Sequence, residues 1–327
     1  MVTRRTLGQG ALALALATPA LRAPRAQETE LPNRPINVIV PWPPGGPTDA
    51  FARVLTQRMS TDTGRSFVVD NRGGAAGTIG MQAAARARPD GTTLVITPNS
   101  TFAIAHHIYP VQYSQERDFT GIGLLASSPL FIMVPGRAPY RTLQDYIAAA
   151  RQPGHRMTYA NSGVGATSHL AVELFMQTAG IEIQEVGYRG GGPALQAVLA
   201  GETGMLVLPT AAAMPLIASG DLRALAVTTR ERSRYAPDVP TFQELGFAGF
   251  EVVEQIAMFA PAGTPEPLLR RFNAVAAAAL RAPDMAPRWQ SMGVTVEAQA
   301  IEAWPAFFAA ENGKWRDFIR ARNIRVQ

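Results

Sequence analysis

Residues 38–49 read Val-Ile-Val-Pro-Trp-Pro-Pro-Gly-Gly-Pro-Thr-Asp. The β-branched run predicts a strand, and it ends in a Pro/Gly loop from which a helix begins at Thr48. This geometry directs backbone N–H groups and the positive end of a helix dipole away from the strand end. Such a place binds anions without a side-chain cation, and ligands of open α/β sheets sit at this edge. We expect an anion-binding loop here; the alternative is a plain strand–helix connection.

A second loop of the same kind follows another short predicted strand. Residues 159–167 read Tyr-Ala-Asn-Ser-Gly-Val-Gly-Ala-Thr, which places glycines and hydroxyl groups at a predicted helix start. The loop has neither the Gly-Lys-Ser/Thr of a nucleotide-binding loop nor the Gly-x-Ser-x-Gly of a nucleophile elbow. Two anion-binding loops far apart in the chain suggest a carboxylate ligand held between two lobes.

The composition is that of a globular protein of 327 residues, with 47% hydrophobic and 17% charged residues. The net charge is +5, but the first 26 residues contain four arginines and no acid, so the rest is nearly neutral. We therefore expect no nucleic-acid partner. The absence of cysteine excludes disulfides, thiol catalysis and thiolate metal sites.

Residues 1–26 have the pattern of a signal peptide. Arg4 and Arg5 precede an apolar stretch at 12–16 that is too short to span a bilayer, and small residues follow to Ala26. The paired arginines are compatible with twin-arginine export, and the general export route stays open. We expect a periplasmic protein.

Strand-like and helix-like segments alternate along the chain, which favours an α/β fold with mostly parallel sheets covered by helices. The element order restarts near Thr142, which can cap a helix. We expect two lobes: residues 27–138 form the first, 139–249 the second, and 250–327 return to the first. Within the first of these ranges, 122–126 and 131–134 are predicted as two strands separated by a Ser/Pro break.

The candidate ligand-binding residues come from these loops and from two other strand ends. In the first loop Trp42 offers an apolar wall, glycines admit a ligand closely, and Asp49 caps the helix or holds water. His169 has three interpretations: a base, a ligand contact, or a helix-start residue packed behind the second loop. Tyr188 and Arg189 offer a phenol and a guanidinium, with a surface position as the alternative. The full set is Trp42, Pro44, Gly45, Gly46, Asp49, Asn99, Ser100, Ser162, Gly163, Gly165, Ala166, Thr167, His169, Tyr188, Arg189 and Leu208. No metal site is expected, because the adjacent His106 and His107 cannot share a helix face.

Several ordered motifs together resemble one known family. They are Arg34-Pro35-Ile36, the 41–49 loop, Val68-Val69-Asp70-Asn71-Arg72-Gly73-Gly74-Ala75-Ala76-Gly77, Ala87-Arg88-Pro89-Asp90-Gly91, the 159–169 loop, Val186-Gly187-Tyr188-Arg189-Gly190, residues 222–228, Pro237-Asp238-Val239-Pro240-Thr241 and Phe259-Ala260-Pro261-Ala262-Gly263-Thr264-Pro265. From about Pro32 to its end, the chain resembles the Bug receptors, the periplasmic solute-binding proteins of tripartite tricarboxylate transporters.

The resemblance implies a type II periplasmic-binding fold that closes on a small organic carboxylate. It implies that the first loop reaches one carboxylate partly through water and that the second loop binds the carboxylate directly. It also implies that membrane transporter subunits, or instead a sensor protein, recognise the closed form. We expect a monomer without a cofactor and without catalytic activity. The alternative from another class is a secreted enzyme on the same fold, acting on a small carboxylate or ester through Ser162 and His169.

Three positions depart from the family pattern. Leu208 stands where the family often has an Asp that faces the ligand, which argues against an amino-acid ligand whose ammonium needs a counter-charge. The first loop has Trp-Pro-Pro where Phe-Ala-Ala is commoner, which changes the pocket volume. Arg189 stands where Lys is usual.

Overall fold

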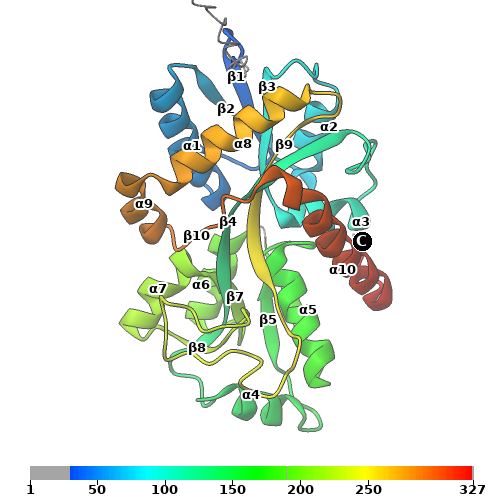
Figure 1. The fold of residues 1–327 in the computed structure, drawn as a ribbon. Helices are drawn as coiled ribbons and strands as arrows, with labels where there is room; N and C mark the ends of the chain where they lie inside the picture. Colours follow the sequence, from blue (N-terminus) through cyan, green and yellow to red (C-terminus); the bar gives the residue numbers. More distant parts are fainter. Residues whose placement is uncertain (1–29, 189, 326–327) are drawn as a thin grey trace, which may run out of the picture.

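The computed structural model describes residues 30–188 and 190–325 of the chain. The expected signal peptide and Arg189 therefore lie outside the described residues. Two lobes stand one above the other, and the long strands β4 (Phe119–Pro135) and β9 (Val253–Pro261) lie at the waist between them (Figure 1). The α/β class and the two-lobed division expected from the sequence are confirmed.

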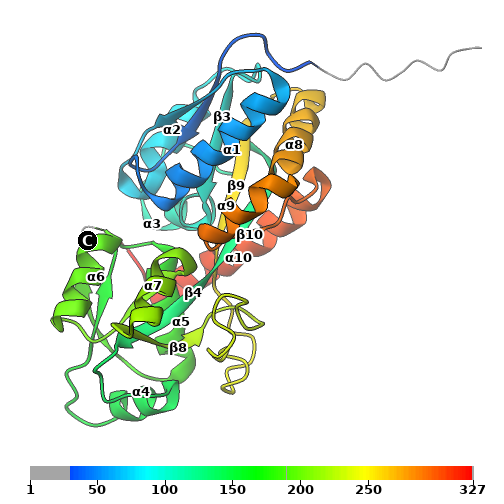
Figure 2. The ribbon, with the colours of Figure 1, turned by 90° about the vertical axis from the view of Figure 1, so that its left-hand side faces the viewer.

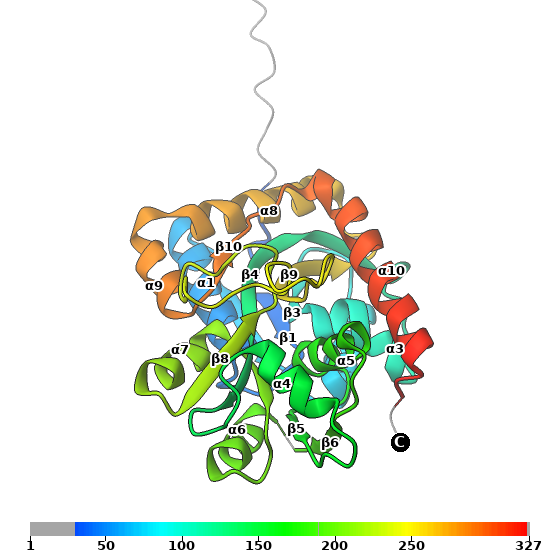
Figure 3. The ribbon, with the colours of Figure 1, turned by 90° about the horizontal axis from the view of Figure 1, so that it is seen from below.

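The first lobe is built from both ends of the described chain. Its other elements are β1 (Ile36–Val40), α1 (Pro47–Thr63), β2 (Phe67–Asn71), α2 (Thr78–Ala85), β3 (Thr93–Pro98), a π-helical turn η2 (Ser100–Ala105), α3 (His106–Ile108), α8 (Glu266–Arg281), α9 (Ala286–Ser291), β10 (Thr295–Val296) and α10 (Trp304–Arg322), with short 3-10 turns at Ala75–Gly77, Pro283–Met285 and Ile301–Ala303. Viewed from below, α8, α9 and α10 form an arc on the outer side of the molecule (Figure 3).

The second lobe is formed by the middle of the chain. Its elements are α4 (Leu143–Ala150), β5 (Thr158–Asn161), α5 (Thr167–Ala179), β6 (Gln184–Gly187), α6 (Gly191–Ala200), β7 (Leu206–Pro209), α7 (Thr210–Ser219) and β8 (Leu222–Val227). In the side view, α6 and α7 lie on the side of this lobe that faces the first lobe (Figure 2). Thr142 caps α4 as expected, because its hydroxyl accepts a hydrogen bond of 3.1 Å from the Asp145 N–H.

The sheets are mixed. In the first lobe β1 pairs in parallel with β2 and β3, while β3–β9, β9–β4 and β4–β10 are antiparallel pairs. In the second lobe β5 and β6 are parallel, and β7 and β8 pair antiparallel with the second half of β4. The expected parallel pairing thus holds within the strand–helix repeats. Each antiparallel pair includes β4 or β9, the two strands that run between the lobes.

The Ser/Pro break predicted between two strands does not interrupt β4, and this prediction was wrong. Ser127, Ser128 and Pro129 pair with Gln255, Glu254 and Val253 of β9, so contacts with a distant strand override the local signal. At Pro129 the partners of β4 change from β9 to β7 and β8. The change lies nine residues before the expected boundary at 138, and the boundaries themselves stay predictions.

One large apolar cluster runs through both lobes and includes Phe102 and Trp304 of the first and Tyr146 and Phe175 of the second, and each lobe also has a cluster of its own. In the first lobe, α1 and α8 pack on the sheet, where Phe51 lies 5.2 Å from Trp289 between ring centroids. In the second lobe, Phe131 and Met133 of β4 are covered by α6 and α7 residues such as Val198 and Ala213. Among residues 30–188 and 190–325, no helix combines the length and the apolarity needed to cross a membrane.

Candidate ligand-binding site

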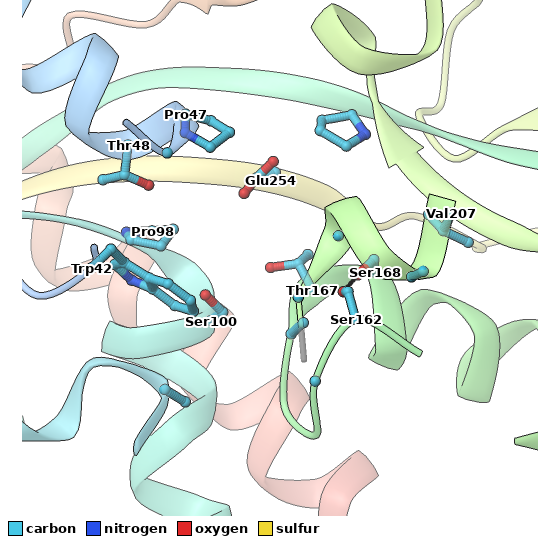
Figure 4. Close-up of a pocket in the computed structure, with 18 of the residues that line it drawn as sticks. Trp42, Pro47, Thr48, Pro98, Ser100, Ser162, Thr167, Ser168, Val207 and Glu254 are labelled. Carbon is cyan, nitrogen blue, oxygen red and sulfur yellow. Dashed lines mark hydrogen bonds between the residues drawn. The ribbon is translucent and has the colours of Figure 1, made fainter. Parts of the chain in front are cut away.

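A cavity of about 640 Å³ lies between the lobes. The first lobe contributes the loop from Trp42 to Thr48, and the second lobe contributes Ser162–Val164 and Ala166–Ser168. Figure 4 shows Trp42 and Thr48 on one side of this space and Ser162, Thr167 and Ser168 on the other. The two loops singled out in the sequence therefore face a common cavity.

Four helices of the described part of the chain begin at the wall of this cavity. Their N-cap residues are Gly46 of α1, Ala166 of α5, Gly190 of α6 and Pro209 of α7, and all four line the cavity. At none of these four helix starts does the N-cap side chain accept a hydrogen bond from the first N–H groups. The first N–H groups of a helix have no partner within it, so their donors and the positive helix ends converge on one space.

The lining is otherwise apolar and nearly free of charge. Trp42, Tyr109 and Leu208 supply apolar surface, and the described lining residues include no Lys or Arg. Glu254 of β9 is the one carboxylate among them. Burial raises the pKa of Glu254 to about 7. An anion in this cavity would be bound by N–H and hydroxyl groups and not by a cation of the described lining.

Asp49 holds the first loop in shape from behind. It is 3% exposed and accepts hydrogen bonds from the Gly45 N–H (2.8 Å), the Arg53 guanidinium (3.0 Å) and the Asn71 amide (2.9 Å). Burial would raise its pKa, but the bonds from Arg53, Gly45 and Asn71 outweigh burial and hold its pKa below the usual range. Trp42 is also fixed, since its indole N–H donates to the Thr101 hydroxyl at 3.0 Å.

His169 supports the second loop in the same manner. It is 4% exposed, and its Nδ1 accepts a hydrogen bond of 3.3 Å from the Gly165 N–H. Burial lowers its pKa, against the opposing effect of Glu185 and Glu173, so the neutral ring is favoured. Ser162 hydrogen bonds to Ser168 at 3.0 Å between hydroxyl oxygens. The Ser162–His169 pair that an enzyme would need is therefore not the pairing observed.

The carboxylates beside His169 form a group that could in geometry hold a metal ion. His169 Nε2 lies 3.9 Å from Glu173 and 3.9 Å from Glu185. Both acids already have protein partners: Glu173 accepts from Tyr159 and Arg322, and Glu185 accepts from Asn161. This network orients the histidine, and we assign no metal centre to it.

Two hydrogen bonds join the lobes beside the cavity. The Thr167 hydroxyl donates to Asn99 Oδ1 at 2.9 Å, and the Tyr109 hydroxyl donates to the Val164 carbonyl at 3.1 Å. The Asn99 amide group donates to the Val253 carbonyl of β9 at 2.9 Å. Asn99 thus links η2, α5 and β9, and its polar atoms are engaged by protein.

The chain matches the sequence profile of the tripartite tricarboxylate transporter family receptor over residues 51–324.

It belongs to this family of solute receptors.

The relatives of this receptor agree with that assignment. It is 36% identical over 311 residues to the UPF0065 protein in the tcbD-tcbE intergenic region of Pseudomonas sp. (strain P51), covering 94% of this chain and 91% of the relative. Among solved structures it is similar to the periplasmic binding protein BugD, with 31% identity, a TM-score of 0.79 and coverage of 90% and 100%. The type II periplasmic-binding fold is confirmed.

Two similar structures hold carboxylates. Rpa4515 of R. palustris, solved with adipate, is 30% identical with a TM-score of 0.82 and coverage of 91% of this chain and 100% of that one. MatC (Rpa3494) of Rhodopseudomonas palustris, solved with malate, is 31% identical with a TM-score of 0.78 and coverage of 88% and 100%.

The structure separates the expected site residues of the receptor into two groups. Those at the cavity wall are Trp42, Pro44, Gly45, Gly46, Ser100, Ser162, Gly163, Ala166, Thr167 and Leu208. Asp49, Asn99, Gly165, His169 and Tyr188 are not among the lining residues, and Arg189 lies outside the described residues. Asp49, Asn99 and His169 instead bind the protein's own loops and strands, because burial leaves their polar atoms no other partners. The binding roles of all these residues stay predictions.

Sequence reasoning missed Glu254 and Tyr109. Glu254 could have been found because it is an acidic residue within the otherwise mostly apolar stretch 252–260, which is predicted to be a strand. Nothing local marked Tyr109, because it reaches the cavity only through the packing of α3 against the second lobe.

Proposed function

We propose that this protein is a periplasmic receptor that captures a small organic carboxylate between its lobes and delivers it to a tripartite tricarboxylate-type transporter. The observation that carries the proposal is the convergence of the uncapped N-termini of α1, α5, α6 and α7 on one cavity. Carboxylates are stabilised at such termini. The adipate and malate bound by the relatives support this ligand class. A sensor protein in place of the transporter would use the same binding chemistry.

Both lobes contribute to the cavity, so a ligand contacts the full set of donors only when the lobes are closed. Binding then shifts the population toward the closed form, and the transporter or sensor partner recognises the surface of that form. The Asn99–Thr167 bond stabilises the same closed form. We expect the receptor to act in the periplasm, in agreement with the signal-peptide pattern of residues 1–26 and with the periplasmic relative BugD, and we expect it to be a monomer.

Isothermal titration of the ligand-free, refolded protein tests the proposal. We expect at least one mono-, di- or tricarboxylate to bind with one ligand per protein, and small-angle X-ray scattering to show a smaller radius of gyration in its presence. Native mass spectrometry of the purified protein would identify a retained ligand. If every carboxylate fails to bind the refolded protein, the proposal is wrong.

Asp49→Ala is expected to weaken carboxylate binding by about 1–3 kcal/mol, because Gly45 and Asn71 lose a buried acceptor and the first loop loses its fixed shape. Ser162→Ala is expected to have an effect of the same size through loss of a cavity hydroxyl. The control is Asp62→Ala, which removes an acid that pairs with Arg58 at the other end of α1. Unchanged affinity in both Asp49→Ala and Ser162→Ala would remove these residues from the site.

A further inference from the structure

Glu254 is an acidic side chain in the wall of the cavity that we propose to bind an anion. Binding of a carboxylate alone does not explain why an acid lies there. It lies on β9 opposite Ser128 of β4, where both strands pass between the lobes. Figure 4 shows its carboxylate beside Pro47 and Thr48 of the first loop. Glu254 also borders a second cavity of about 310 Å³, which it shares with Gly45–Thr48, Ser127 and Met292.

The Glu254 carboxylate has no hydrogen bond or ion pair with any other residue in 30–188 and 190–325. The described residues lining the two cavities include no other carboxylate and no cation, and the Tyr109 hydroxyl is engaged by Val164. The residues that line the second cavity with Glu254 include Gly46 and Thr48 of the first loop, Ala211 and Ala212 of α7, and Ser127, none of which is charged. A partly buried carboxylate without a protein partner is costly, and its raised pKa reflects that cost.

We propose that Glu254 recognises a hydrogen-bond donor on the ligand, an ammonium or a hydroxyl group, and so selects amino or hydroxy acids over plain carboxylic acids. This inference rests on the proposed function. The helix N-termini bind the ligand's carboxylate, and Glu254 accepts from a donor elsewhere on the same molecule. A second ligand carboxylate facing Glu254 would repel it unless a proton were taken up.

The inference also changes the meaning of Leu208. The missing Asp at this position argued against a ligand with an ammonium group, because a buried ammonium needs a counter-charge. Glu254 supplies a carboxylate in the same cavity from another strand. With Leu208 and Glu254 both at its wall, the cavity keeps one carboxylate among its described lining residues, and that carboxylate can serve as the counter-charge.

Matched acids that differ by one group test the inference. The probes are succinate, malate and aspartate, and butanoate, 4-hydroxybutanoate and 4-aminobutanoate, titrated by calorimetry into the ligand-free protein. In at least one series we expect the hydroxy or amino acid to bind about 10- to 100-fold more tightly than the parent acid. In Glu254→Gln the advantage of the amino acid is expected to disappear, because the amide carries no charge; in Glu254→Leu both advantages disappear, while the parent acid keeps its affinity.

Glu251→Gln is the matched control, since Glu251 pairs with Arg230 at 2.8 Å and is absent from the described cavity lining. It should bind every probe like the wild type. Circular dichroism of each variant establishes that it is folded; Glu254→Gln removes an unpaired, partly buried carboxylate and is expected to fold.

The number of protons released on binding distinguishes a ligand ammonium group from a ligand hydroxyl group. Burial raises the pKa of Glu254 to about 7, so part of it is protonated near neutral pH, and a ligand ammonium would drive it to the ionised form. Titrations in two buffers of different ionisation enthalpy should therefore show release of a fraction of a proton per aminated ligand in the wild type. Glu254→Gln should show no such release, and a hydroxy acid should give little.

Three results separate the hypotheses. If acids bind but the parent acid matches its hydroxy and amino forms in every series, the inference is wrong and the proposed function stands. If the protein prefers hydroxy or amino acids and this preference survives in Glu254→Leu, another residue binds the ligand's donor group and the inference is wrong. If no acid binds the wild type, the proposed function fails and this inference fails with it.

Discussion

Gly80→Ala is expected to destabilise the protein by about 1–3 kcal/mol and to weaken carboxylate binding by about 10- to 100-fold. Gly80 lies in α2, and a Cβ there would come within 2.6 Å of Pro41 Cβ and 2.7 Å of the Arg72 carbonyl oxygen. Both neighbours are stiff, being a proline and a piece of backbone. The added methyl group must push α2 away from Pro41, where the first binding loop begins.

Gly313→Ala is the matched control for Gly80→Ala. Gly313 also lies inside a helix, α10, and the nearest atom to an added Cβ is the Arg316 guanidinium at 3.9 Å. With space available, the better helix propensity of alanine should stabilise the protein by about 0.5–1 kcal/mol. Urea unfolding and calorimetry measure both variants. Equal stability and affinity for Gly80→Ala and wild type would show that α2 does not constrain the loop.

Trp304→Ala is expected to lower the free energy of unfolding by about 3–5 kcal/mol, the largest loss for a single side chain predicted here. Trp304 is 6% exposed at the start of α10, and its ring centroid lies 5.0 Å from Phe259 of β9 and 5.7 Å from Phe102 of η2. Removing the indole opens a cavity between three elements that cannot all close onto it.

Trp304→Phe keeps an aromatic ring at this position and should cost less than Trp304→Ala. Guanidinium unfolding followed by circular dichroism compares the two variants with the wild type. A loss below about 1 kcal/mol for Trp304→Ala would mean that α10 is not a structural part of the first lobe. Since η2 also carries Ser100 of the cavity wall, the experiment also tests how firmly that wall is supported.

The local features of the binding loops follow from short stretches of sequence. The prolines and glycines between Pro41 and Pro47 stop a strand and start a helix without a side-chain cap, and the structure has α1 begin at Pro47 with Gly46 as its N-cap. Thr142 predicts its own helix start equally well. Such signals are readable because both partners of each contact lie within a few residues of each other.

The hydrogen-bond partners of buried polar side chains could not be predicted from short stretches of sequence. Asp49 and His169 were both candidate ligand-binding residues, and both brace a loop from behind, which for His169 is one of the three interpretations that the sequence left open. A small rotation of the helix about its axis decides whether a polar side chain at its start faces a ligand or a backbone N–H of a neighbouring loop. The residue types are the same in either case.

The sequence alone thus determined the alternating elements, the two glycine loops and the family to which they belong, since these depend on local conformational preferences and on ordered motifs. The tertiary structure alone decided that β4 runs unbroken between the lobes, that Asn99 bonds to Thr167 across 68 residues, and that Glu254 reaches the cavity unpaired. These facts arise from pairing between segments far apart in the chain, and the free energy of such contacts outweighs the local preferences that a sequence displays.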